Sequence, residues 1–184
     1  IPLAYSPVRK TEPVSTVRKF NQGRATILFV GKLRKYKGVK FLIRALQYLP
    51  DVRLRIVGSG EELSNLKRLT SKLGIDSRVT FLGNIPNEHI PVEYKNADIF
   101  VLPSIDGSEA FGIVQAEAMS YGLPVINTDL PSSVPFVSIN EVTGITIPPG
   151  DPVALASAIR KLCDDPVFYE KCSYNALQRA KLFT

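Results

Sequence analysis

The stretch ATILFVGKLRKYKGVKFLIRAL (residues 25–46) predicts a β-strand, a loop and an α-helix in direct succession. ATILFVG (25–31) is a short apolar run that ends in glycine, which is typical of a strand buried on both faces of a sheet. The apolar residues that follow recur at helical spacing, at Val39, Leu42, Ile43, Leu46 and Leu49. Pro50 then ends the helix. A strand followed at once by a helix is the unit from which parallel sheets are built.

The same alternation continues to the end of the chain. Further strands are predicted at 53–58, 78–83, 97–103, 123–128 and 144–148. Further helices are predicted from Leu63 to a left-handed cap at Gly74, within 87–96, from about 111 to 121, after a cap at Asp151, and from about Pro166. This pattern predicts the α/β class, a parallel sheet with helices on both faces. We expect one domain at 25–184, preceded by a polar linker segment at 1–24.

Composition narrows the possible functions. With 184 residues, 45% of them apolar, the chain is long enough for one solid core. It contains no apolar run of the ~20 residues that a membrane helix needs, and its start does not resemble a signal peptide, so we expect a cytoplasmic location. Cys163 and Cys172 are too few for a zinc site or a disulfide framework and are expected to be reduced, structural thiols. The single histidine, His89, is expected to be a solvated loop or helix-start residue and not a catalytic base.

The net charge of +6 is concentrated near the start of the chain. Residues 1–40 contain ten of the 23 lysines and arginines and one acid, a net charge of +9, whereas the remainder carries −3. Such a basic segment attracts phosphates, nucleic acid or an anionic membrane surface. We interpret Arg9 to Arg24 as a solubilising tail, but Lys32 to Lys40 directly follow a strand. Nucleic-acid binding is not expected because no aromatic stacking platform accompanies the basic residues.

Ligands of open parallel sheets bind outside the carboxyl ends of the strands. Gly31 and Lys32 follow the first strand, and Lys37 stands at the start of the next helix. A glycine, two lysines and a helix N-terminus together suit a phosphate group, although a turn with solvated lysines fits the local sequence equally well. VGSGEEL (57–63) begins like a dinucleotide-binding fingerprint, but Leu63 occupies the place of the third glycine, and a tight turn explains the stretch equally well.

SEAFGIVQAEAMSYGLPVI (108–126) places Glu109 and Glu117 around a predicted helix start. The free amides of residues 111–113 would form an anion site there, with Glu117 about one and a half turns into the helix. Carboxylates beside an anion site make sense if they accept hydrogen bonds from hydroxyl groups. A molecule with phosphates in the middle and hydroxyl-rich groups at both ends, such as a nucleotide sugar, fits this pattern. Taken singly, Glu109 could be a helix-start acid and Glu117 an exposed polar residue.

Four segments together resemble a known family. They are GKLRKYKG (31–38), ADIFVLPS (97–104), the 108–126 segment and PPGDPVALASAI (148–159). They are similar to the C-terminal domain of family 4 retaining glycosyltransferases with the GT-B fold, over about 26–183. This resemblance implies a Rossmann-like domain that binds the donor sugar nucleotide without a metal ion or other cofactor.

The resemblance also implies roles for individual residues. Lys32 and Lys37 match the basic pair on the donor diphosphate, where the family usually has arginine first, and Glu109 matches the acid near the transferred sugar. These three are the expected catalytic residues. The residues expected to bind the donor nucleotide are Gly31, Lys32, Lys37, Gly58, Gly83, Ile85, Glu109, Phe111, Gly112, Ile113 and Glu117. Among them Glu117 matches the acid on the ribose hydroxyls. The chain departs from the family at SSVPF (132–136), where Gly-Gly-x-Pro-Glu is common.

The resemblance therefore implies the donor-binding half of a retaining glycosyltransferase. Its expected reaction moves a hexose from a nucleoside-diphosphate sugar, with uridine, guanosine or adenosine as the base, to an acceptor in surface polysaccharide or glycolipid synthesis. The expected partners are an N-terminal acceptor domain, absent from these residues, and peripherally a membrane that carries a lipid-linked acceptor. The chain alone is expected to bind nucleotide without transferring sugar. Two alternatives are a non-catalytic nucleotide-binding module and a nicotinamide-dependent oxidoreductase, which the missing third glycine disfavours.

Overall fold

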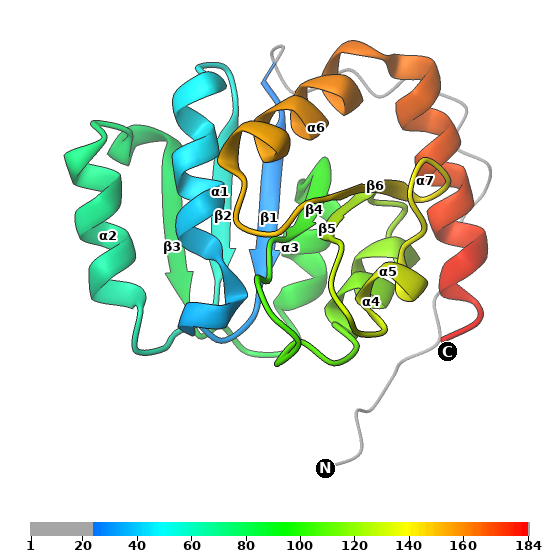
Figure 1. The fold of residues 1–184 in the computed structure, drawn as a ribbon, viewed down its shortest axis with the longest axis horizontal. Helices are drawn as coiled ribbons and strands as arrows, with labels where there is room; N and C mark the ends of the chain where they lie inside the picture. The colour runs from blue at the N-terminus through cyan, green and yellow to red at the C-terminus, as the bar shows by residue number, and fades with distance from the viewer. Residues whose placement is uncertain (1–23, 184) are drawn as a thin grey trace.

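The computed structural model of the protein describes residues 24–183, so the linker segment expected at 1–24 lies outside the described residues except for Arg24. Six strands form one parallel sheet in the order β3-β2-β1-β4-β5-β6 (Figure 1). The strands are β1 (Thr26–Val30), β2 (Arg53–Val57), β3 (Val79–Gly83), β4 (Ile99–Leu102), β5 (Val125–Thr128) and β6 (Gly144–Ile147). The predicted Rossmann-like parallel sheet is confirmed.

The helices cover both faces of the sheet. They are α1 (Val39–Ala45), α2 (Leu63–Lys72), α3 (Ile90–Asn96), α4 (Val114–Ser120), α5 (Val134–Val137), α6 (Pro152–Asp164) and α7 (Pro166–Ala180). The strand order reverses between β1 and β4, so right-handed crossovers place α1 and α2 on one face and α3 and α4 on the other. Contacts agree with this arrangement: α1 packs against α2 and α6, whereas α4 packs against α7 (Figure 1). No helix within 24–183 is both long and apolar enough to cross a membrane.

A single hydrophobic core lies between the sheet and its helices. All four residues of β4 and all four of β5 are buried, as expected for strands covered on both faces. Phe29 of β1 and Phe100 of β4 are the largest of the fully buried side chains. β1 and β4 pair in parallel, so their carboxyl ends lie next to each other.

The start of α4 corrects a prediction from the sequence. The helix begins at Val114 and not near Phe111, because Gly112 has a φ of 65°, in the left-handed region that an α-helix does not allow. A Cβ at Gly112 would also lie 2.5 Å from Leu102 Cδ2. Glu117 is therefore in the first turn of α4, and not one and a half turns into it. The short helix α5, which begins within the SSVPF segment, was not predicted.

The cap predicted at Asp151 is confirmed. Its Oδ1 accepts hydrogen bonds from the amides of Val153 and Ala154, both at 2.9 Å, and Pro152 occupies the first helical position of α6. The cap fixes the turn at which the chain leaves β6 and begins α6.

Replacing Asp151 by alanine leaves two amides of α6 without their acceptor. We expect the Asp151→Ala chain to lose about 1 kcal/mol of unfolding free energy, measured by urea denaturation. Asp164→Ala, which removes an exposed carboxylate at the other end of α6, is the matched control and should change stability by less than about 0.5 kcal/mol. Equal losses in the two variants would contradict the capping role.

Candidate functional site at the carboxyl edge of the sheet

Glycines bring the loops after β1 and β2 into backbone contact. A Cβ at Gly58, whose φ is 125°, would lie 1.9 Å from the carbonyl oxygen of Gly31. The Gly58 amide donates to the carbonyl of Gly83 at 2.8 Å, and the Gly31 amide donates to that of Val57 at 3.0 Å. The ends of β1, β2 and β3 therefore meet as bare backbone, which leaves space for a ligand above them.

A cavity of about 300 Å³ opens over this contact. Its lining combines aliphatic side chains, glycines and polar groups: Val30, Gly31, Lys32, Val57, Gly58, Ser59, Asn84, Ile85, Asn87 and Ile90. Four of the predicted site residues, Gly31, Lys32, Gly58 and Ile85, are among them. Gly83 adjoins the cavity through its carbonyl bond to Gly58. An apolar wall with a few polar groups suits a flat, partly polar molecule such as a nucleobase.

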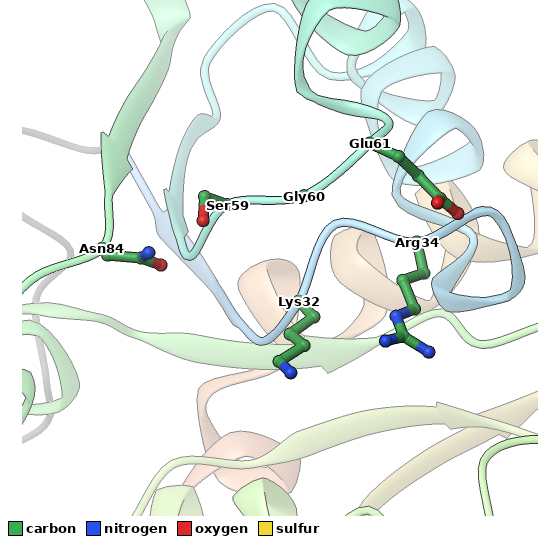
Figure 2. A pocket seen from close by; sticks show the side chains of 6 residues that line it. All are labelled: Lys32, Arg34, Ser59, Gly60, Glu61 and Asn84. Atoms are coloured by element: carbon green, nitrogen blue, oxygen red, sulfur yellow. The ribbon is translucent and has the colours of Figure 1, made fainter.

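An adjoining cavity of about 320 Å³ extends the first one and shares Lys32, Ser59 and Asn84 with it. Figure 2 shows that Lys32 and Arg34 extend from the loop after β1 to the same side of the opening, with Asn84 at the end of β3. Both cationic side chains are exposed. Arg34 was not predicted as a site residue, although it lies within the basic run Lys32 to Lys40 that the sequence singles out.

Lys37 and Glu109 form an ion pair at the point where the strand order reverses. The Lys37 Nζ lies 2.5 Å from Glu109 Oε2, and the buried Ser104 hydroxyl donates to the same oxygen at 2.8 Å. The two charged side chains are only 12% and 8% exposed. Lys37 follows β1, whereas Ser104 and Glu109 follow β4, so the pair joins the loops on either side of the switch point, where open α/β sheets bind ligands.

The ion pair leaves part of each group unused. An ammonium has three donors, and one of the Lys37 donors goes to Glu109. Within residues 24–183, Glu109 Oε1 has no hydrogen-bond partner. Lys37 can therefore hold Glu109 and an anion at the same time, while Glu109 keeps one oxygen for a hydroxyl group.

The segment before α4 presents free amides, as predicted. In the part of the chain that the structure describes, the amides of Phe111, Gly112 and Ile113 donate no hydrogen bond. The segment is held from behind by the buried Gln115, whose side-chain amide donates to the Phe111 carbonyl at 3.3 Å. The buried Asn127 of β5 donates to Gln115 Oε1 at 2.9 Å. Sequence reasoning missed both residues; the signal was an asparagine inside the apolar run LPVINT.

Glu117 has a hydrogen-bond partner on α3. Its Oε2 accepts a hydrogen bond of 2.9 Å from the hydroxyl of Tyr94 on α3. Burial, reinforced by the neighbouring carboxylate, raises the pKa of Tyr94 well above its usual range, so the hydroxyl stays protonated and donates. Tyr94 was not predicted as part of the site.

The remaining candidate groups do not form a site. The exposed His89 stands at the residue before α3, the helix-start position that was predicted, and its side chain makes no capping hydrogen bond. Cys163 and Cys172 are free thiols, and burial raises their pKa to about 12 and about 11, so neither forms a thiolate near neutral pH. No group of three or more potential metal ligands occurs between residues 24 and 183.

Removing the Lys37 ammonium should leave the Glu109 carboxylate charged in a largely buried position. We expect Lys37→Met to lower the unfolding free energy by about 3 kcal/mol, and addition of Glu109→Gln to restore much of that loss, because no uncompensated charge remains. Lys161→Met, which breaks a pair that is 49% and 62% exposed, is the control and should cost less than about 1 kcal/mol. Urea unfolding of the four chains tests this; a double variant as unstable as Lys37→Met would contradict it.

Comparison with known proteins places the chain in a family. The family model described as glycosyl transferases group 1 matches residues 11–179. D-rhamnosyltransferase WbpZ of Pseudomonas aeruginosa is 36% identical over 163 residues, which are 88% of this chain and 42% of that protein. The chain thus spans about two fifths of the length of the curated relatives that it matches.

Solved structures agree with the sequence comparison. Anabaena Alr3699/HepE in complex with UDP superimposes with a TM-score of 0.81 and 27% identity, over 87% of this chain and 44% of that one. Sucrose-phosphate synthase from Thermosynechococcus elongatus gives a TM-score of 0.78 and 31% identity, over 92% of this chain and 44% of that one. The predicted fold class and resemblance are confirmed, and the chain belongs to the group 1 glycosyl transferases.

Proposed function

We propose that the chain is the donor-binding half of a retaining glycosyltransferase, which moves a hexose from a nucleoside-diphosphate sugar to an acceptor. The observation that carries the proposal is the Lys37–Glu109 pair, which joins the loops after β1 and β4 at the switch point of the sheet. The similarity to a protein solved with UDP supports a nucleotide at this edge.

In this proposal the diphosphate lies between Lys32, Lys37 and the amides of residues 111–113. When the bond between the sugar C1 and the diphosphate oxygen breaks, negative charge grows on the diphosphate. Positioned amides and ammonium groups that bind this charge more strongly in the transition state accelerate the reaction. The lysines and amides supply this positive charge, so the proposed step uses no metal ion.

Glu109 is proposed to orient the transferred sugar. Its Oε2 is fixed by Lys37 and Ser104, which leaves Oε1 to accept a hydrogen bond from a sugar hydroxyl. A carboxylate held from two sides loses little freedom when the sugar binds, and such preorganisation strengthens binding. The same lysine then contacts both the diphosphate and the acid beside the sugar.

The base is proposed to occupy the cavity, and the ribose is proposed to lie between the cavity and α4. Gly31, Gly58 and Ile85 line the space for the base, with Gly83 supporting Gly58. Glu117 is proposed to accept hydrogen bonds from the ribose hydroxyls. Charge-assisted hydrogen bonds of this kind contribute about 1.5–3 kcal/mol each.

The acceptor is proposed to bind a domain that precedes these residues in the intact protein. Residues 25–184 would then form the donor domain, and the two domains would face each other across the diphosphate. We also propose that the acceptor is a lipid-linked sugar at the cytoplasmic face of a membrane, which the protein contacts peripherally.

The chain alone is expected to bind a nucleoside diphosphate weakly. Isothermal titration calorimetry with UDP, GDP and ADP should give a dissociation constant on the order of 0.1–1 mM for at least one of them, about 5 kcal/mol of binding free energy. No sugar transfer is expected from the chain by itself. A folded chain that releases heat with none of the three nucleotides would overturn the assignment of the donor site.

Loss of the Glu117 carboxylate should weaken nucleotide binding by about tenfold, because the ribose hydroxyls lose a charged acceptor. The variant Glu117→Ala is compared by calorimetry with Glu170→Ala, which removes an exposed acid of α7. Circular dichroism checks that both chains are folded. Unchanged affinity in folded Glu117→Ala would show that Glu117 does not bind the ribose.

A further inference from the structure

Tyr94 is a buried tyrosine that the proposed reaction does not use. We propose that Tyr94 is a positioning residue for ribose recognition, which holds the Glu117 carboxylate ready to accept the ribose hydroxyls. The inference rests on the proposed function, because it assigns a partner to the acid that would bind the ribose.

The hydrogen bond from Tyr94 gives the two carboxylate oxygens of Glu117 different roles. The Tyr94 hydroxyl donates to Glu117 Oε2 at 2.9 Å. Among residues 24–183, Oε1 of Glu117 has no hydrogen-bond partner. One oxygen is thus occupied by the protein, and the other is left as an acceptor for hydroxyl donors of a ligand.

The tyrosine ring is itself rigidly held. Tyr94 is 2% exposed and lies parallel to the ring of Tyr121, with centroids 5.2 Å apart and planes 14° apart. On another side it packs against Phe100 of β4, at 6.1 Å between centroids. A ring packed in this way has a fixed hydroxyl position, so the hydrogen bond fixes Glu117 and not the reverse.

Tyr94 also connects Glu117 to the cavity. Ile90, which lines the cavity, lies one helical turn before Tyr94 on α3, and residues four apart share one face of a helix. The face of α3 that forms the wall of the cavity therefore also carries the group that holds Glu117. In the proposed complex, the ribose then lies between the base in the cavity and the Glu117 carboxylate that Tyr94 holds.

Glu117 needs such a partner because it is only half-buried. An unrestrained glutamate samples many rotamers, and ordering it when a ligand binds reduces affinity. Because Tyr94 already orders the Glu117 side chain in the free protein, less affinity is lost when the ligand binds. A tyrosine hydroxyl is protonated at physiological pH, and burial raises the pKa of Tyr94 further, so it can donate to the carboxylate throughout that range.

The test is Tyr94→Phe, which removes the hydroxyl and keeps the ring. Affinity is measured by calorimetry for whichever of UDP, GDP and ADP binds most tightly, and for its 2′,3′-dideoxy counterpart. We expect Tyr94→Phe to weaken binding of the ribonucleotide by about tenfold and of the dideoxy form by less than about twofold. In a Glu117→Ala background, Tyr94→Phe should not weaken nucleotide binding further, because Tyr94 acts on the ribose only through Glu117.

Tyr169→Phe is the matched control. The Tyr169 hydroxyl is also buried and donates to the Asp98 carbonyl at 2.7 Å, at the amino end of β4, away from the site. Its removal should leave both affinities unchanged. Thermal unfolding of both variants separates a loss of stability from a loss of binding.

The outcomes separate the two proposals. If the unsubstituted chain binds ribose and dideoxy forms equally, or binds no nucleotide, the ribose role of Glu117 fails and the inference falls with it. If the unsubstituted chain prefers the ribose form and Tyr94→Phe keeps the full preference, only the positioning role is overturned. Equal weakening of both nucleotides, or failure of Tyr94→Phe to fold where Tyr169→Phe folds, would show a structural role instead and would also overturn it.

Discussion

The site depends on one contact between two backbones. The Gly31 carbonyl lies so close to Gly58 that no side chain fits between the loops after β1 and β2. The sheet therefore ends in bare peptide groups at this point. Side chains around them, such as Lys32 and Ile85, line the cavity. Any larger residue at Gly58 would collide with the Gly31 carbonyl and push the two loops apart.

The electrostatics of this edge are balanced and not simply positive. Lys37 is neutralised by Glu109, and Glu117 is occupied by an uncharged tyrosine, so neither acid stands without a partner. Attraction for an anion comes from the exposed Lys32, the two remaining donors of Lys37 and the free amides before α4. In the proposed complex, Glu109 and Glu117 lie on either side of the diphosphate. Neither carboxylate points at the diphosphate, because each already accepts a hydrogen bond from a donor of the protein.

The fold could be predicted because the central strands β1, β4 and β5, which are buried on both faces, read as apolar runs, and all six strands lie within the predicted ranges. The start of α4 could not, because the left-handed conformation of Gly112, where Leu102 of β4 leaves no room for a Cβ, is a feature of the packed fold and not of the local sequence. Tyr94 and Asn127 were missed for a related reason. Their partners, Glu117 and Gln115, lie 23 and 12 residues away in the sequence, and only the packing of α3, α4 and β5 brings them together. The assigned roles of the site residues remain predictions.

The SSVPF departure has a structural counterpart that bears on the free amides. The Ser133 amide donates to the Ala110 carbonyl at 2.9 Å, so α5 is tied to the segment that leads into Phe111. Phe136 is 64% exposed, and Arg179 lies over its ring at 5.1 Å while donating to the Val137 carbonyl. An exposed apolar ring beside a guanidinium thus stands at the position where the family resemblance led us to expect an acid. In the proposed donor site, a phenylalanine at this position adds no negative charge that would repel a diphosphate at the amides of residues 111–113.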